Sequence, residues 1–316
     1  MNILITGGTG FVGSKLIEVL SRNNLNNLFL LSRKSDHTLN KSIKQIINVD
    51  PENFFKTAIP SDVDVVVHLA GRAHILNEEI ESPIDEFRKV NVEGTLDLAR
   101  QALKNNVKRF IFISSIGVNG AVTYTQAFTE DSKPNPHADY ALSKYEAEQA
   151  LKNLFKGSKT ELVIIRPPLV YAAHAPANFN RFMKIISSKV PLPFGLINNK
   201  RSMIALENLV DFIICCITHP AAANDLFLIS DGEDLSTKQL VIYVANGMSR
   251  RKILVPIPII MLQIGAILIN KPMIYKQLCC SLVVDSKKAF SVLGWRPVVS
   301  AHEALFESGK KFIKDN

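Results

Sequence analysis

The 316-residue chain is predicted to have an α/β fold, a doubly wound parallel sheet of the Rossmann type with a smaller C-terminal substrate-binding lobe. Short, nearly continuous apolar strands alternate with helical patterns up to residue 171, and a glycine-rich turn joins the first strand to the first helix. Beyond residue 171, proline-rich turns and mixed short elements predict the smaller lobe. We therefore assign residues 1–171 to the Rossmann domain and 172–316 mainly to the lobe, with some segments returning to the sheet.

The expected elements follow from hydrophobic periodicity and β-branched content. The expected strands occupy residues 2–6, 28–32, 46–50, 63–71, 107–115 and 161–171, and a later one at 225–230 rejoins the sheet. The expected helices occupy residues 11–22, 87–106 and 139–155.

The composition is that of an ordinary globular protein, with 47% hydrophobic and 21% charged residues. No charged and apolar leader precedes the first strand, so we expect no secretory signal and a cytoplasmic location. The four cysteines form the adjacent pairs 215–216 and 279–280, a spacing that suits neither a disulfide framework nor a metal site. We therefore expect reduced core cysteines and no bound metal.

The net charge of +8 comes from scattered lysines and arginines rather than from a dense basic block. We therefore expect no nucleic-acid partner. A phosphate-bearing ligand, or a general richness in lysine, accounts for the charge.

Residues 253–269 are uncharged and apolar, which raises the question of membrane contact. The stretch is at the short end for a bilayer crossing, and Pro256 and Pro258 shorten its helical part to about 11 residues. A buried or partly exposed helix of the C-terminal lobe is the favoured interpretation, and peripheral contact with a membrane is the alternative.

The stretch TGGTGFVG, which follows the first strand, predicts a phosphate-binding turn. Gly7, Gly10 and Gly13 permit a tight turn and close approach of the backbone to a diphosphate. The helix that opens at Phe11 and Val12 offers free N–H groups and a favourable dipole. We therefore predict a dinucleotide cofactor, with a purely structural turn as the alternative.

The end of the second strand bears on which dinucleotide binds. An acidic residue there would accept hydrogen bonds from a ribose 2′-hydroxyl and repel a 2′-phosphate. The chain has Ser32, Arg33 and Lys34 instead, and a guanidinium suits a phosphate. We therefore favour NADP(H), contacted by Ser32 and Arg33. The alternative is NAD, with Arg33 a solvated loop residue and either Asp36 or no residue in the acidic role.

Tyr140 and Lys144 lie four residues apart in the stretch YALSK, so both side chains can face one cleft from a helix. Alone, they are an ordinary helix-face pair. Ser114 and Ser115 end an earlier strand, and ligands bind at the carboxyl ends of parallel strands. The ordered set of glycine turn, strand-end serine and Tyr-x-x-x-Lys favours a catalytic pair, a proton donor beside the cation that tunes it.

These motifs occur together with VVHLAG, NVEGT, RPPLVY and LGWRP over nearly the full length. The chain thus resembles an extended short-chain dehydrogenase/reductase of the NAD-dependent epimerase/dehydratase family, whose members act on sugar nucleotides. The resemblance implies that Tyr140 is the acid/base at the sugar C4 oxygen, and that Lys144 holds the nicotinamide ribose and lowers the tyrosine pKa. It implies that Ser115, with Ser114 as second choice, hydrogen-bonds the reacting oxygen.

The resemblance also implies further contacts to the cofactor, from an acid near the adenine to a segment under the nicotinamide. Beyond the residues already named, they are Asp50, Leu69, Ala70, Gly71, Asn91, Ser114, Pro167 and Val170. His68 is interpreted as a satisfied core histidine, with a place in the cofactor-lining strand end as the alternative.

For the substrate, Asn178 resembles a family asparagine near the diphosphate, and Arg201 resembles the arginine that grips phosphate. The stretch PLPFG resembles the one that braces the uracil. An ordinary loop role is the alternative for each. Where the family has a Gly-Pro turn after RPPLVY, this chain has Ala172 and Ala173, which puts the local loop geometry in doubt.

The reaction is narrowed by the residues after the strand-end serine. Sugar 4,6-dehydratases of the family carry an Asp-Glu pair there, but this chain has Ile116 and Gly117, which argues against dehydration. A 4-ketoreductase that uses NADPH and a 4-epimerase that holds NAD tightly are the two remaining hypotheses. Arg33 favours the reductase.

A finer resemblance, to UDP-glucose 4-epimerase-like proteins of bacterial surface polysaccharides, lies in the stretches RPPLVY, ANFNRFMKIISSKVPLPFG, NKRSMIALENLVDFI, FLISDGEDLSTKQL and SLVVDSKKAFSVLGW. Some of these proteins resemble reductases, which implies a UDP-4-keto-6-deoxy-N-acetylhexosamine as substrate, for O-antigen in lipopolysaccharide biosynthesis. The family also implies a homodimer. A nucleotide-sensing scaffold and a flavonoid- or steroid-type reductase are the alternatives from other classes.

Overall fold

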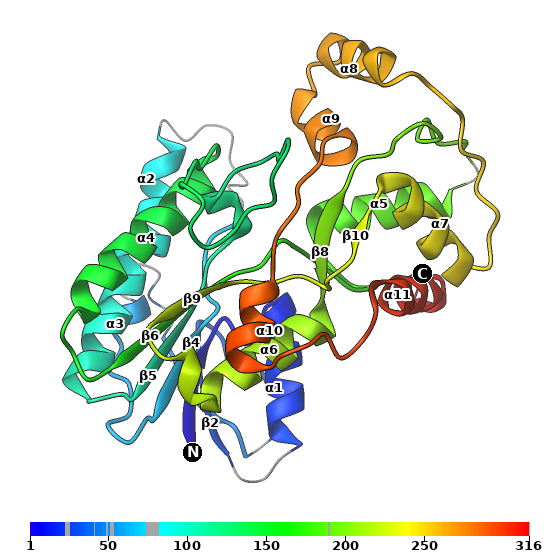
Figure 1. Cartoon of the computed structure of the whole chain (residues 1–316). Helices are drawn as coiled ribbons and strands as arrows, with labels where there is room; N and C mark the ends of the chain where they lie inside the picture. The colour runs from blue at the N-terminus through cyan, green and yellow to red at the C-terminus, as the bar shows by residue number, and fades with distance from the viewer. Residues whose placement is uncertain are drawn as a thin grey trace.

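The computed structural model describes residues 1–22, 26–40, 42–48, 50, 54–73, 82–188 and 190–315. Its centre is a seven-stranded parallel sheet with the order β3-β2-β1-β4-β5-β6-β9 (Figure 1). The order reverses beside β1, which is where a doubly wound sheet binds its ligand. The predicted fold class is therefore confirmed. The strands are β1 (Asn2–Thr6), β2 (Asn27–Ser32), β3 (Lys44–Ile47), β4 (Val65–His68), β5 (Arg109–Ile113), β6 (Glu161–Arg166) and β9 (Asp225–Leu228).

Several strands differ in extent from those that the sequence predicts. Those expected at 63–71 and 107–115 are shorter, because the chain leaves the sheet after His68 and Ile113. The strand expected at 46–50 spans Lys44–Ile47. It is an edge strand, so its bounds are set only by the residues that pair with β2. Residue 49 of the expected strand lies outside the described residues.

The single strand expected at 161–171 is two strands in the structure. Pro167 and Pro168 separate β6 from β7 (Leu169–Tyr171), because proline has no N–H to donate to a sheet ladder. β7 joins a second, three-stranded sheet with the order β10-β8-β7. Its other strands are β8 (Arg201–Ala205) and β10 (Asp234–Leu235).

Helices cover both faces of the main sheet. One face buries a cluster that includes Leu16 of the first helix and Phe212 of the sixth, and the other buries one that includes Leu98 and Leu151. The helices against the sheet are α1 (Phe11–Ser21), η2 (Lys89–Glu93), α3 (Gly94–Lys104), α4 (Asp139–Phe155), α6 (Leu206–Thr218) and α10 (Lys287–Leu293), and α2 (Pro83–Arg88) packs on α4. Short 3₁₀ turns are η1 (Phe54–Lys56), η3 (Ile116–Val118) and η4 (Pro220–Ala222).

The helix expected at 139–155 coincides with α4, whereas the one expected at 87–106 is interrupted. It begins earlier, where Pro83 takes the first helical position that suits its fixed φ. A π-helical turn, η2, then separates α2 from α3 and carries Asn91 on its inner side. Such single π turns are frequent at functional sites.

The second lobe has a core of its own, formed by the small sheet with α5, α7 and α11 around Tyr171 and Leu305. Within the residues that the structure describes, no helix is long and apolar enough to cross a membrane. The helices of the lobe are α5 (Ala177–Ser187), α7 (Thr237–Gly247), α8 (Ile259–Leu268), α9 (Pro272–Cys279) and α11 (Ala301–Asp315).

The four cysteines are free thiols, but their placement differs from the prediction. Cys216 is buried in the sheet-side core, as expected. Cys215 and Cys279 are half-buried and pack against the sheet-side core and the second-lobe core, respectively. The core prediction is wrong for Cys280, which is half-buried just after the end of α9.

Candidate active site

The glycine turn forms a cradle for a phosphate at the carboxyl end of β1. Gly7 has φ +72°, and a Cβ on Gly13 would lie 2.2 Å from the carbonyl oxygen of Gly7. The turn is closed by a hydrogen bond from the Gly10 N–H to the Gly7 oxygen at 3.0 Å. No side chain among the described residues caps α1, so its first N–H groups remain free for an anion. This cradle fits the diphosphate of a dinucleotide.

A buried chain of hydrogen bonds connects this turn to η2. Thr6 Oγ1 lies 2.7 Å from His68 Nδ1, and His68 Nε2 lies 2.9 Å from Thr95 Oγ1. Thr95 donates its own proton to the Asn91 carbonyl, so His68 donates from Nε2 and accepts at Nδ1. Burial lowers the pKa of His68 to about 3, which keeps the ring neutral. His68 is therefore a satisfied core histidine, as the favoured interpretation had it.

The end of β2 offers a cation and no acid. Arg33 is exposed, and in the described part of the chain it makes no ion pair or side-chain hydrogen bond. Ser32 is buried, and its hydroxyl donates to the Lys34 carbonyl at 2.8 Å. Asp36 closes a turn onto Thr38, and these hydrogen bonds lower the pKa of its carboxyl. The end of β2 therefore presents an exposed guanidinium.

Lys144 projects from the second turn of α4 into the space below the end of β5. Its Nζ donates to the Ile113 carbonyl at 2.9 Å and lies 4.6 Å from the centroid of the Phe112 ring. Burial lowers the pKa of Lys144 to about 8, against the opposing effect of the Glu148 charge.

Tyr140, one turn earlier on α4, packs edge-on against Phe87, with ring centroids 6.2 Å apart. Burial raises the pKa of Tyr140 to about 12. Lys144 Nζ lies 6.0 Å from the Tyr140 ring centroid. In this arrangement the ammonium is not among the groups that shift the tyrosine pKa, so the expected lowering stays a prediction.

The glycine turn and the Tyr-Lys pair border the same loop after β4, although they are far apart in sequence. A Cβ on Gly7 would lie 2.7 Å from the Ala70 nitrogen, so the turn packs directly on this loop. A Cβ on Gly71 would lie 3.2 Å from Lys144 Nζ and 3.2 Å from Asn91 Oδ1. The predicted cofactor turn and Lys144 of the predicted catalytic pair therefore contact the same loop.

The two strand-end serines point in different directions. Ser115 is half-buried, and its Oγ accepts a hydrogen bond from the Gly117 N–H at 3.1 Å, which leaves its proton free to donate. Ser114 is buried, and its hydroxyl donates to Glu148 at 2.5 Å. The carbonyl of Pro167, the residue directly after β6, accepts a hydrogen bond at 3.0 Å from the N–H of Ile116, the neighbour of Ser115.

Glu148 and Arg166 form a fully buried ion pair that sequence reasoning missed. Arg166 donates to Glu148 from Nε at 2.8 Å and also from Nη2, and its Nη1 donates to Asn119 at 2.9 Å. Glu148 lies one turn beyond Lys144 on α4. A usable signal was present, since Arg166 is a lone cation in an apolar strand and Glu148 follows Lys144 at helical spacing.

Two further predicted cofactor residues are held in place by hydrogen bonds. Asn91 is buried, and its amide brackets the backbone of Arg72 while donating to Ser143 at 3.0 Å. Asn91 therefore fixes the loop after β4 against α4. Asp50 is half-buried, and its N–H donates to Asn48 Oδ1 at 3.0 Å.

A pocket of about 170 Å³ in the second lobe contains both predicted substrate residues, Asn178 and Arg201. Asn178 donates to Gln277 at 3.3 Å, and Arg201 donates to the Cys280 carbonyl at 3.2 Å. Burial lowers the pKa of Arg201. The other lining residues are Leu169, Phe179, Phe182, Met203, Thr237, Leu240, Gln277 and Leu278.

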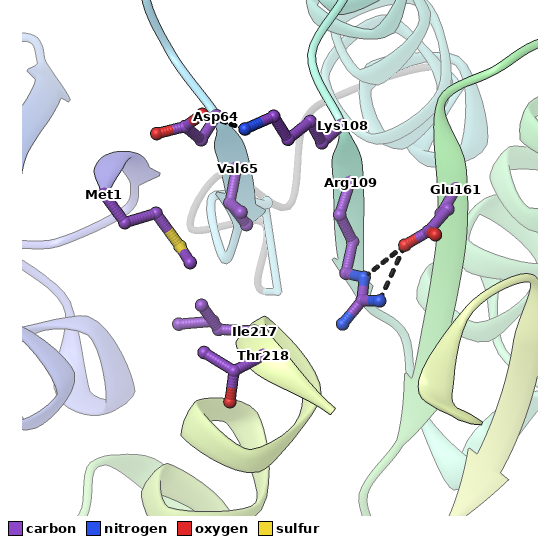
Figure 2. Close-up of a pocket in the computed structure, with 8 residues that line it drawn as sticks. All are labelled: Met1, Asp64, Val65, Lys108, Arg109, Glu161, Ile217 and Thr218. Carbon is purple, nitrogen blue, oxygen red and sulfur yellow. Dashed lines mark hydrogen bonds and ion pairs between the residues drawn. The ribbon is translucent and has the colours of Figure 1, made fainter. Parts of the chain in front are cut away.

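A second pocket, of about 460 Å³, lies at the opposite edge of the main sheet (Figure 2). It is lined by residues at the amino ends of their strands, such as Val65, Arg109 and Glu161. Arg109 is already satisfied there by Glu161 at 2.6 Å and by the carbonyl of Cys216 at 2.6 Å. Ligands of doubly wound sheets bind at the carboxyl edge, so we do not assign this pocket to the site.

A model of the NAD dependent epimerase/dehydratase family matches residues 3–229. The chain is 39% identical to a UDP-glucose 4-epimerase of Vibrio cholerae, in an alignment that covers 100% of this chain and 96% of that protein.

Solved structures share the fold over the full length. A UDP-glucose 4-epimerase of Thermotoga maritima, solved with UDP-glucose, superposes with a TM-score of 0.77 at 22% identity and covers 100% of this chain and 99% of its own. A UDP-glucuronic acid 4-epimerase of Bacillus cereus, solved with NAD, gives a TM-score of 0.79 at 20% identity with the same coverage of 100% and 99%. At these identities the likeness establishes the fold.

Proposed function

The chain belongs to the NAD dependent epimerase/dehydratase family, and we propose that it is an oxidoreductase of UDP-sugars that acts at the sugar C4. Its family makes it an NAD(P)-dependent enzyme. One observation carries the proposal: the loop after β4 contacts the glycine turn through Ala70 and Lys144 through Gly71. A dinucleotide bound at the turn would therefore extend toward Tyr140 and Lys144.

The proposed chemistry is proton transfer by Tyr140 coupled to hydride transfer at C4. When bound, the nicotinamide cofactor supplies the hydride to C4 or accepts it. Tyr140 donates its hydroxyl proton to the C4 oxygen during reduction and takes a proton back in the reverse direction. The Lys144 ammonium stabilises the phenolate that remains. Ser115, whose Oγ already accepts a hydrogen bond from the Gly117 N–H, keeps its own proton and donates a hydrogen bond to the same oxygen.

The finer proposal is reduction of a 4-keto sugar, with NADPH as the donor. Arg33, exposed at the end of β2 with no acid beside it, supports recognition of a 2′-phosphate. A UDP-4-keto-6-deoxy-N-acetylhexosamine, of the kind that supplies O-antigen, is the substrate that we propose. Arg201 and Asn178 would hold its diphosphate in the second-lobe pocket.

A 4-epimerase is the second candidate, and the similarity to the Vibrio cholerae UDP-glucose 4-epimerase favours it. An epimerase returns the hydride to the same sugar, so it gains from holding one NAD tightly. The two candidates use the same Tyr140 and Lys144, and they differ in the cofactor and in whether it is released.

Cofactor preference tests the proposal. Protein stripped of nucleotide is titrated separately with NADH and NADPH. We expect tighter binding of NADPH and loss of that preference in Arg33→Asp, while Lys159→Asp, an equal charge change at another exposed site, keeps it. Turnover is then measured with 4-keto-6-deoxy UDP-sugars. NAD that copurifies, together with interconversion of UDP-glucose or UDP-GlcNAc, would instead establish the epimerase.

A further inference from the structure

Helices α8 and α9 stand out from the second lobe, at the top of the view in Figure 1. Every residue of α8 is exposed or half-buried, although the helix contains no charge. The exposed fraction is 60% at Ile260 and 81% at Leu268. The exposed side chains that we name the α8–α9 apolar surface are Ile259, Ile260, Met261, Ile264, Ile267, Leu268, Ile269, Met273 and Ile274.

This surface is held in place from its inner side, and none of the residues that the structure describes covers its outer side. Leu262 of α8 and Leu278 of α9 pack against the core of the second lobe. A helix that is apolar on all sides is normally buried, and clustered exposed apolar residues mark an interaction site. The charges around the surface indicate the chemistry of the partner that would cover it.

The surrounding chain is cationic and free of acids. From residue 235 to residue 284 the sequence has no Asp or Glu. Lys271 and Lys276 are exposed beside the apolar side chains, and neither makes an ion pair with any residue that the structure describes. The cations of this segment are Lys238, Arg250, Arg251, Lys252, Lys271 and Lys276.

We propose that the α8–α9 apolar surface inserts into the headgroup region of a membrane that contains anionic lipids. Apolar side chains flanked by lysines complement such a surface, since the acyl boundary takes the former and the lipid headgroups attract the latter. A helix of ten residues is about 15 Å long, so α8 would lie in the interface.

A second copy of the chain is a poorer occupant. In a two-fold interface the same patch faces itself, so Lys271 and Lys276 would meet like charges. No carboxylate between residues 235 and 284 offsets that repulsion.

The proposed contact would also place the second-lobe pocket near the lipid headgroups. Gln277 and Leu278 of α9 line the pocket that contains Asn178 and Arg201. The membrane contact is independent of the proposed reaction, because vesicle binding is measured without cofactor or substrate.

Flotation with lipid vesicles tests the proposal. The full chain is mixed with vesicles of phosphatidylcholine alone, or of phosphatidylcholine with phosphatidylglycerol. We expect stronger binding to the vesicles that contain phosphatidylglycerol. For the triple variant Ile260→Ser, Ile264→Ser, Ile267→Ser, we expect the affinity for both kinds of vesicle to fall by at least about tenfold. The double variant Lys271→Gln, Lys276→Gln should lose about fivefold per cation, on the anionic vesicles alone.

Matched controls separate the surface from general effects of charge and hydropathy. Val298→Ser removes an exposed apolar residue elsewhere, and Lys152→Gln removes an exposed cation on α4, so both should bind vesicles like the unmodified chain. The emission spectrum of Ile264→Trp, after subtraction of the spectrum of the unmodified chain, should shift to the blue when anionic vesicles are added.

Two results would overturn the proposal. One is equal vesicle binding by the unmodified chain and the triple isoleucine variant, with no blue shift in Ile264→Trp. The other is a dimer in solution that the triple variant converts to a monomer, with no vesicle binding by either. The second result would assign the surface to a second copy.

Discussion

Lys144 Nζ donates to the main-chain carbonyl of Ile113 at 2.9 Å, and this bond ties α4 to the end of β5. The bond holds the Lys144 ammonium at Ile113, the residue directly before the Ser114-Ser115 pair, while Tyr140 lies one helical turn away on α4. The position of the ammonium is thus set by the sheet rather than by the helix alone. Because a carbonyl holds the ammonium without neutralising it, the charge of Lys144 can still act on the phenolate of Tyr140.

Tyr140→Phe should lower turnover by about two to four orders of magnitude while cofactor still binds. The variant keeps the ring packing against Phe87 and loses the hydroxyl that exchanges the proton. Turnover of the UDP-sugar and fluorescence titration of NADPH are the two measurements. Tyr145→Phe, at a half-buried tyrosine of the same helix, is the control and should keep its activity. Substantial residual turnover in Tyr140→Phe would exclude the acid/base role.

Activity should fall as the pH rises through about 8. Burial lowers the pKa of Lys144 to about 8, so above that pH the ammonium that stabilises the Tyr140 phenolate is lost. The measurement is kcat against pH from about pH 6 to pH 10. Lys144→Met should be much less active and should lack this alkaline decline. An unmodified chain whose kcat is constant over the range would contradict the assignment.

The fold could be predicted because its signals are local. Alternating apolar strands and helices, and the helix over 139–155, depend on periodicity that neighbouring residues carry. Strand ends and the separation of β6 from β7 could not be predicted as well. They depend on which strand pairs with which, and β7 leaves the main sheet to pair with β8 in the second lobe.

The site could be predicted in part for the same reason. The glycine turn and the Tyr140–Lys144 pair are compact motifs, whereas Ser114 and Ser115 are neighbours that only their surroundings distinguish. The partner of Ser114 is Glu148, which pairs with Arg166 on another strand. Such a pairing is a tertiary contact. The sequence shows that Arg166 is a lone cation in an apolar strand, but it does not show that Glu148 is the side chain that meets it.

Two variants of the glycine turn distinguish an effect on the free energy of unfolding from an effect on cofactor binding. In Gly13→Ala the new methyl would lie 2.2 Å from the Gly7 oxygen, so the backbone must shift, at a cost of about 1–3 kcal/mol in unfolding free energy. In Gly10→Ala the nearest atom, the Gly7 carbonyl oxygen, is 3.1 Å away, so a smaller shift is needed and the loss of unfolding free energy should be smaller than in Gly13→Ala. Urea unfolding and NADPH titration measure the two effects.

We expect NADPH affinity to fall in both glycine variants, because either methyl disturbs the N–H groups that receive the diphosphate. Full affinity in Gly10→Ala would show that the phosphate is not held at this turn. Ala substitution at Gly157, a surface glycine with φ +75°, controls for glycine replacement and should leave NADPH affinity unchanged.

The Glu148–Arg166 pair should affect both the free energy of unfolding and the pKa of Lys144. Glu148→Met leaves the Arg166 charge buried without its partner, so the free energy of unfolding should fall by about 3–5 kcal/mol. The double variant Glu148→Met, Arg166→Met removes both charges and should recover most of that loss, because an apolar pair of similar volume needs no desolvated charge. Urea unfolding of the unmodified chain, both single variants and the double variant gives the coupling energy.

The same variants test whether Glu148 tunes Lys144. The Glu148 charge raises the lysine pKa against burial, so removing it should move the alkaline decline of kcat to lower pH. This shift should persist in the double variant, although its stability is restored. A purely structural role of Glu148 predicts instead that the pH profile returns to that of the unmodified chain together with stability. The pH profile of the folded double variant therefore distinguishes an electrostatic role of the pair from packing alone.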